Sequence, residues 1–205
     1  IRSEMPFVER VSCFADARSI LKKSLPELVK LRDLGLTLLY VGLDSGDEQT
    51  LASMNRGCTV SDTIESAKRI HKAGIQLSAI ALLGLGGRKN SHRHATATAA
   101  ALNQMEPEFI GIVTTLLDED APLFELAERG DFQLPSRLGL LEEMATILEG
   151  LTLRKGLLTA NHSSNYLPLR VVLPYQRQDA IKYIRQILDT KDESILKPDF
   201  LRNLH

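Results

Sequence analysis

Residues 36–43 have the sequence LTLLYVGL and are followed directly by Asp44, Ser45 and Gly46. A strand with one wet face alternates apolar and polar residues, whereas this run is apolar almost throughout. It therefore predicts a strand that is covered on both faces, as in a parallel sheet. The polar residues after it predict that the strand ends there in a loop.

On both sides of this strand the sequence alternates between short apolar runs and helical patterns. Ser24 and Glu27 have the spacing of a capping box, which predicts a helix that ends at Gly35. The expected strands are 11–15, 36–43, 75–83, 109–117 and 157–160, and the later helices are 48–55, 59–73, 92–105, 122–129, 136–151 and one within 176–205. The tail beyond Thr190 is expected to be loosely held.

Repeated βα units with short connections predict an α/β fold with parallel strands, because their crossovers are right-handed. The sheet is either open and doubly wound or all or part of a (β/α) barrel. Five strands do not close the usual eight-stranded ring. In both architectures ligands bind at the carboxyl ends of the strands, so polar residues at those ends are the candidates for a site.

Composition excludes several classes of protein. The 205 residues include 25 Lys or Arg and 26 Asp or Glu, and the net charge of −1 gives no chain-wide field for nucleic acid or an anionic membrane. No apolar run reaches the ~20 residues that cross a bilayer, and the cytosol is the expected compartment. Two cysteines, Cys13 and Cys58, are too few for a disulfide framework or a tetrathiolate zinc site.

The end of the 36–43 strand is the first candidate site. Gly42 and Asp44 share one face of the strand, so the small residue leaves room below the carboxylate for a polar ligand. The alternative is that Asp44 and Ser45 only cap the following helix.

The glycine-rich loop at 84–87 is the second candidate site. It lacks the spacing of a dinucleotide or phosphate-binding loop. Its glycines would let a flat ring approach the backbone, although a plain tight turn explains them equally well. His92 and His94 point in different directions on a helix, and we expect both to lie at a solvated, basic helix start with Arg88, Lys89 and Arg93.

The loop NHSSN at 161–165 is the third candidate site, because it follows a predicted buried strand. Its amides and hydroxyls could orient the ring of His162, or the loop could simply bond its own backbone. Cys13 and Cys58 have no evident base beside them, so nucleophilic cysteine catalysis is not expected. A metal-free lyase would need an inward Lys or Glu base at a strand end, and the sequence offers no convincing one.

Several ordered blocks carry a resemblance to a known family. They are LLYVGLDSGD at 38–47, MNRGCT at 54–59, HKAGI at 71–75, LLGLGG at 82–87 and NHSSNYLP at 161–168. This pattern resembles the radical SAM superfamily, and most closely its uncharacterised Fe-S oxidoreductase branch, linked by analogy to oxygen-independent coproporphyrinogen oxidase. The resemblance covers about residues 11–174.

The resemblance implies a partial (β/α) barrel, TIM-barrel-like but incomplete, that uses S-adenosylmethionine and a [4Fe-4S] cluster. The family holds this cluster with a Cys-x3-Cys-x2-Cys motif, which is absent here, so no cluster and no turnover are expected in this chain alone. The chain, which begins with Ile1, therefore resembles the C-terminal part of the catalytic barrel. Residues 1–175 would form that part, and 176–205 a C-terminal helix and tail.

The same resemblance implies roles for individual residues. Asp44 and Ser45 would face the ribose and methionine portions of the cofactor, although the family usually has Glu at the first position. Arg18 could pair with a carboxylate, or form an ordinary surface ion pair. The residues expected to flank the adenine are Leu83, Gly84 and Gly86, and those expected to border the substrate are Asn161 and His162.

The expected activity of the complete protein is reductive cleavage of S-adenosylmethionine followed by hydrogen abstraction from an unidentified, small-molecule substrate. The alternative is a non-catalytic half-barrel that binds an adenosine-containing ligand or a protein partner. An unpaired sheet edge also favours a homo-oligomer. Neither nucleic acid nor a membrane is an expected partner.

Overall fold

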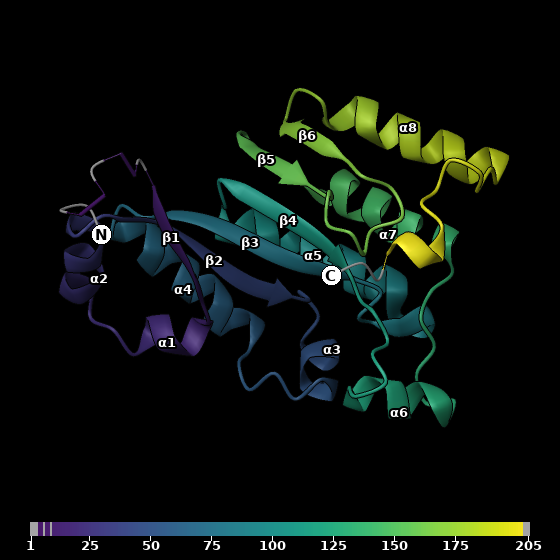
Figure 1. Ribbon diagram of the computed structural model, residues 1–205, viewed down its shortest axis with the longest axis horizontal. Helices are drawn as coiled ribbons and strands as arrows, with labels where there is room; N and C mark the ends of the chain where they lie inside the picture. Colours follow the sequence, from purple (N-terminus) through teal and green to yellow (C-terminus); the bar gives the residue numbers. More distant parts are fainter. Residues whose placement is uncertain (1–3, 6, 9, 203–205) are drawn as a thin grey trace.

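The computed structural model describes residues 4, 5, 7, 8 and 10–202, which form one six-stranded sheet with helices packed against it (Figure 1). The strands are β1 (Val11–Ala15), β2 (Leu36–Asp44), β3 (Gln76–Leu83), β4 (Phe109–Thr114), β5 (Gly156–Thr159) and β6 (Arg170–Leu173). The helices are α1 (Ala17–Leu21), α2 (Leu25–Asp33), α3 (Glu48–Ser53), α4 (Val60–Lys72), α5 (Gly87–Met105), α6 (Pro122–Glu128), α7 (Arg137–Gly150) and α8 (Arg177–Thr190), and a 3-10 turn covers Asp199–Leu201.

The strands lie in the sheet in the order of the sequence. The pairs from β1 to β5 are parallel, as predicted. The sheet does not close on itself, which confirms an incomplete, TIM-barrel-like α/β fold. The sequence did not predict the sixth strand, β6, which pairs antiparallel to β5 at one edge of the sheet.

The hydrophobic core lies between the helices and one face of the sheet. Along β2, Leu39, Val41 and Leu43 are buried in this core, whereas Tyr40 and Gly42 between them are half-buried. Leu38 and Asp44, on the same face as Tyr40 and Gly42, are buried as well, and no residue of β2 is exposed. The strand is therefore covered on both faces as predicted, although less completely at Tyr40 and Gly42.

Local signals explain most helix boundaries. The predicted capping box of Ser24 and Glu27 starts α2, and Thr59 with Asp62 forms a second one at α4. The start of α5 was predicted at residue 92, but this helix begins at Gly87, five residues earlier. The difference arises because Gly86 is the N-cap residue without a side-chain cap, and such a start has no capping signal in the sequence.

The segment after α8 is anchored, which contradicts the expectation of a loose tail. Leu196 is buried in the core, and Arg202 is 6% exposed. The Arg202 guanidinium lies 3.7 Å from the centre of the Tyr166 ring, and its Nε donates to the carbonyl of Ser164 at 2.7 Å. The tail is therefore fastened to the third candidate loop. No helix among the described residues is long and apolar enough to cross a membrane.

Candidate functional site at the carboxyl ends of the strands

The three candidate segments lie at the same end of the sheet. Leu83 pairs with Thr114, and the backbone N–H of Thr114 donates to the hydroxyl of Ser164 at 3.0 Å. Ser45, after β2, contacts His94 at 2.7 Å, and that ring also bonds the carbonyl of Leu82 near the end of β3. The sheet therefore brings together segments that are more than a hundred residues apart in the sequence.

Asp44 has an unusual backbone and a buried carboxylate. Its φ of +57° lies in the left-handed region, and the pairing of β2 with β3 shifts register between Gly42 and Asp44. Such irregularities re-aim a side chain at a strand end and are enriched beside active sites. The carboxylate forms an ion pair with Arg56 from the loop before α4. Burial raises the pKa of Asp44, and the Arg56 guanidinium partly opposes that effect.

Gly42 lies directly beside this carboxylate, on the face of the strand that the sequence predicts. A Cβ built on Gly42 would lie 3.2 Å from Oδ1 of Asp44 and 3.5 Å from Nη2 of Arg56, so these two side chains fill the space that a larger residue would need. Ile80, which pairs with Gly42 on the neighbouring strand, is half-buried. An acidic, a basic and an apolar side chain therefore lie around Gly42.

Ser45 is completely buried and points toward α5. Its hydroxyl accepts the N–H of Asp47 at 3.0 Å, so it donates to Nδ1 of His94 at 2.7 Å. The Nε2–H of His94 donates to the carbonyl of Leu82 at 2.8 Å. Ser45 therefore connects the loop after β2 with the end of β3.

The expectation of a solvated His94 is wrong, because its side chain is completely buried. This residue falls on the face of α5 that packs against the core, together with Ala95, Thr98 and Leu102. Burial lowers the pKa of His94, while the Leu82 carbonyl and Asp47 act in the opposite direction. The neutral ring fits its hydrogen bonds, since Nδ1 accepts and Nε2 donates.

The residue that caps α3 is Asp47 and not Asp44 or Ser45. Its Oδ2 accepts the N–H of Thr50 at 3.1 Å and is also 3.0 Å from Nη2 of Arg93 on α5. The hydrogen bonds from Thr50 and Arg93 lower the pKa of Asp47, although burial alone would raise it. The alternative prediction, that Asp44 and Ser45 only cap the following helix, is therefore wrong.

The glycines of the second candidate segment are packed against protein atoms. A Cβ on Gly84, whose φ is +84°, would lie 2.9 Å from Leu140 Cδ2, and one on Gly86 would lie 2.7 Å from Cβ of His94. One on Gly87 would lie 3.0 Å from the ring of Phe132. The close approach of α5, α7 and the 132–135 segment thus accounts for glycine at all three positions.

A residue that the sequence did not single out holds this turn. Glu143 on α7 is 1% exposed, and its carboxylate accepts the N–H of Gly84 and the hydroxyl of Ser91, each at 2.6 Å. Ser91, directly before the predicted helix start at 92, lies within α5, and its hydroxyl donates to Glu143. The sequence signal that could have identified Glu143 is its position on the apolar stripe of α7, between Leu140 and Ile147.

The third candidate loop is attached to the end of β4. Asn165 donates to the carbonyl of Ile112 at 2.7 Å and accepts the Thr114 hydroxyl at 2.8 Å. The N–H of Ser164 donates to Nδ1 of His162 at 3.2 Å, which leaves Nε2 to carry the proton of the neutral ring. His162 and the preceding Asn161 are both exposed at this end of the sheet.

Of the remaining predicted site residues, Leu83 is buried and Arg18 is exposed. Leu83 lies against the helices, in the core rather than on the less completely covered face. Arg18 on α1 is exposed and lies beside the loop that carries Arg56, because a Cβ on Gly57 would be 3.0 Å from its Nη1. Within the described part of the chain, no ion pair involves Arg18.

Comparison with known proteins identifies the part of the chain that forms this end of the sheet. The family model described as the Radical SAM superfamily aligns with the stretch that includes Asp44, Arg56, Leu83 and the glycine turn. Residues 17–100 match the Radical SAM superfamily. The match confirms the predicted resemblance at the level of the superfamily for this stretch.

The proteins to which this chain is similar are distant and longer. The uncharacterized protein MJ0486 of Methanocaldococcus jannaschii is 32% identical over 93 residues, which is 45% of this chain and 28% of that protein. Archaeal Methanocaldococcus infernus Elp3 superposes with a TM-score of 0.63 at 17% identity, over 86% of this chain and 42% of the other. Methylornithine synthase (PylB) superposes with a TM-score of 0.50 at 14% identity, over 70% of this chain and 40% of the other. The chain thus spans less than half of each relative.

The described residues do not fit the iron–sulfur cluster of a radical SAM enzyme. Cys13 is exposed on β1 and Cys58 lies in the loop after α3, and the whole sequence has no other cysteine. Among the described residues, no group of three or more His, Cys, Asp or Glu side chains could hold a metal ion. A [4Fe-4S] cluster needs closely spaced thiolates, which these residues do not supply.

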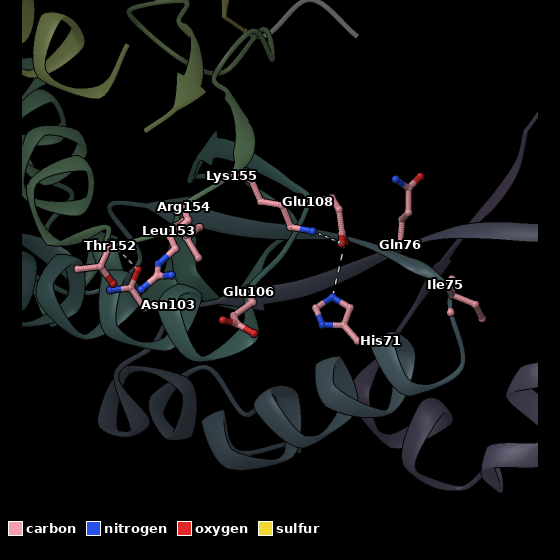
Figure 2. A pocket seen from close by; sticks show the side chains of 11 residues that line it. His71, Ile75, Gln76, Asn103, Glu106, Glu108, Thr152, Leu153, Arg154 and Lys155 are labelled. Atoms are coloured by element: carbon pink, nitrogen blue, oxygen red, sulfur yellow. Dashed lines mark hydrogen bonds and ion pairs between the residues drawn. The ribbon is translucent and has the colours of Figure 1, made fainter. Parts of the chain in front are cut away.

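A cavity lies at the opposite end of the sheet from the three candidate segments (Figure 2). It has a volume of about 660 Å³ and lies where β3 and β4 begin. Glu108 in its wall accepts the N–H of Leu77 at 2.9 Å, with His71 Nε2 at 3.6 Å and Lys155 Nζ at 4.0 Å. Glu108 thus ties the strand starts together, which is a stabilising role, whereas ligands of such folds bind at the carboxyl ends.

Proposed function

We propose that this chain is the C-terminal part of the catalytic barrel of a radical SAM enzyme, and that it binds the adenosyl portion of S-adenosylmethionine. In such an enzyme the bound cofactor supplies a 5′-deoxyadenosyl radical that abstracts hydrogen from the substrate. The observation that carries the proposal is the ion pair of the buried Asp44 with Arg56 beside Gly42, which lies inside the stretch that matches the family.

The side chains around Gly42 suit a nucleoside in their chemistry. The Asp44 carboxylate can accept hydrogen bonds from ribose hydroxyls, and Arg56 holds that carboxylate in place. The half-buried side chains of Ile80 and Leu82 offer an apolar surface for a flat base. Asn161 and His162, exposed at the same end, would face the substrate. The cytosolic setting and the coproporphyrinogen oxidase-like branch belong to this proposal.

Replacing Asp44 with asparagine is expected to weaken binding of S-adenosylhomocysteine about tenfold, the size of one lost charge-assisted hydrogen bond. Asparagine is the appropriate change because it tolerates the left-handed backbone of this position. Isothermal titration calorimetry measures the affinity. Asp33→Asn is the control, since Asp33 is exposed and is the last residue of α2. Equal affinity of Asp44→Asn and the wild type would contradict the proposal.

The position of the ligand is tested separately by NMR. Amide shifts are expected to change at 42–46 and 82–86 when S-adenosylhomocysteine is added. Shifts confined to the cavity around Glu108, or no binding at millimolar concentration, would overturn the proposed site.

Anaerobic reconstitution of the wild-type chain with iron and sulfide is expected to give no stoichiometric cluster, because its two cysteines lie on separate elements. Iron content and absorbance in the visible range measure the outcome. A stable cluster held by this chain alone would show that the cluster ligands need not come from other residues of a longer protein.

The alternative function is a half-barrel that binds an adenosine-containing ligand or a protein partner without cluster chemistry. The observation that favours it is the lack of fit for a cluster among the described residues. The two functions differ in one measurable outcome. A reconstituted longer protein that includes a Cys-x3-Cys-x2-Cys segment would cleave S-adenosylmethionine reductively only if the enzyme proposal is correct.

The edge strand β1 is expected to mediate self-association. It pairs only with β2 among the described strands, and its Phe14 is 78% exposed while stacking on Tyr40. Phe14→Lys is expected to shift a concentration-dependent dimer to monomer in light scattering, and Tyr175→Lys is the control at another exposed aromatic. A wild-type chain that stays monomeric over a wide concentration range would be incompatible with this expectation.

A further inference from the structure

Glu143 is a buried acidic residue that the proposed binding of the nucleoside does not use directly. It comes from α7, far along the chain from the stretch that matches the family, and is 1% exposed. Its Oε2 accepts the N–H of Gly84 and its Oε1 accepts the Ser91 hydroxyl, each at 2.6 Å. One carboxylate therefore links the end of β3, α5 and α7.

The same turn is held from other directions as well. His94 donates to the carbonyl of Leu82 at 2.8 Å, and the N–H of Thr115 donates to the carbonyl of Leu83 at 2.9 Å. The N–H of Gly87 donates to the carbonyl of Gly84 at 3.0 Å. Of the groups that hold residues 82–84, Glu143 is the one that can change its charge near neutral pH, because burial keeps His94 neutral.

Burying a carboxylate without a cationic partner is costly, and an apolar side chain would pack at this position more favourably. Burial raises the pKa of Glu143 to about 7, against the hydrogen bonds from Ser91 and Gly84. The groups on the described elements that set this pKa include no charged side chain. A costly group whose two short hydrogen bonds join this turn to α5 indicates that the position of the turn matters.

We propose that Glu143 is a positioning residue, which fixes the Gly84–Gly87 turn in the place where the nucleoside of the ligand contacts the end of β3. This inference rests on the proposed function. Glu143 acts through Gly84 and Ser91, so it does not touch the ligand itself. In the ionised state both hydrogen bonds are charge-assisted and hold the turn most firmly.

Two substitutions separate positioning from simple packing. Glu143→Ala is expected to weaken S-adenosylhomocysteine binding at least tenfold at pH 8, because the N–H of Gly84 loses its acceptor. Glu143→Gln keeps an acceptor for this N–H and is expected to restore the affinity to within about threefold of the wild type. Glu142→Gln is the control, since Glu142 is on the same helix but is exposed and pairs with Arg185.

The pH profile provides the second readout. Wild-type affinity is expected to fall severalfold from pH 8 to pH 6, and the Gly84 amide signal to titrate near pH 7, whereas Glu143→Gln removes both changes. Asp44 and His94 titrate equally in both proteins, so their effects cancel in the comparison. If Glu143→Ala does not fold, the wild-type and Glu143→Gln profiles decide, and identical profiles would overturn the inference.

Failure of this inference differs from failure of the proposed function. If Asp44→Asn weakens binding and the Glu143 variants bind like the wild type at every pH, the ligand site stands and the positioning role does not. If the wild-type chain binds no S-adenosylhomocysteine, the proposed function itself is wrong.

Discussion

Gly46→Ala is expected to destabilise the protein by about 3 kcal/mol, at the upper end of the cost of overpacking. A Cβ at this position would lie 2.1 Å from the carbonyl oxygen of Ala97 and 2.6 Å from the backbone nitrogen of Thr98. Both atoms belong to the backbone of α5, so the clash cannot be relieved by rotating a side chain. The loop after β2 must move away, which also breaks the hydrogen bond from the N–H of Gly46 to Thr98.

Urea unfolding followed by circular dichroism measures this loss of stability. Gly111→Ala is the matched control, because the nearest atom to its Cβ would be Cγ1 of Ile80 at an ordinary 3.7 Å. Its free energy of unfolding should stay within about 0.5 kcal/mol of the wild type. Should the two variants unfold at the same urea concentration, the close approach of Gly46 to α5 would be disproved.

The pH dependence of stability is expected to reveal the buried Glu143. Its pKa is about 7 in the folded protein, against 4.5 for the free side chain, so the folded state binds the proton more tightly. Its contribution to stability is therefore fully present below pH 4.5 and is lost as the pH rises through about 7. The size of this loss is about 3 kcal/mol.

Comparing the wild type with Glu143→Gln isolates this effect. The free energy of unfolding of the wild type should fall relative to that of the variant between pH 5 and pH 8, because glutamine does not ionise. Urea unfolding at a series of pH values gives the difference, and Glu142→Gln, whose carboxylate is exposed, should show no such trend. Parallel curves for the wild type and Glu143→Gln would mean that Glu143 does not titrate in this range.

The order of the elements could be predicted from the sequence because each has a local signal. Capping boxes mark the starts of α2 and α4, and the apolar runs that were read as strands from 11–15 to 157–160 are β1 to β5. The carboxyl ends of those strands carry the polar segments, and parallel topology alone brings such segments together. The placement of Asp44 beside Gly42 followed from the alternation of side chains along a strand.

The residues that hold the site could not be found in this way, because their roles depend on tertiary contacts. His94 and Glu143 are polar residues on apolar helix stripes, and which hydrogen bonds satisfy them depends on how α5 and α7 pack. Periodicity identifies their positions but not their partners. The four-residue strand β6 follows a loop and has no pattern of its own that distinguishes it.

The attachment of Arg202 to the third candidate loop has a consequence for how this loop can move. The Tyr166 hydroxyl donates to Asp199 at 2.6 Å, and Lys197 donates to the carbonyl of Ser163 at 2.9 Å. Residues 163–166 and 197–202 are therefore held together by several contacts. A displacement of residues 163–166 would break these contacts and release the C-terminal segment.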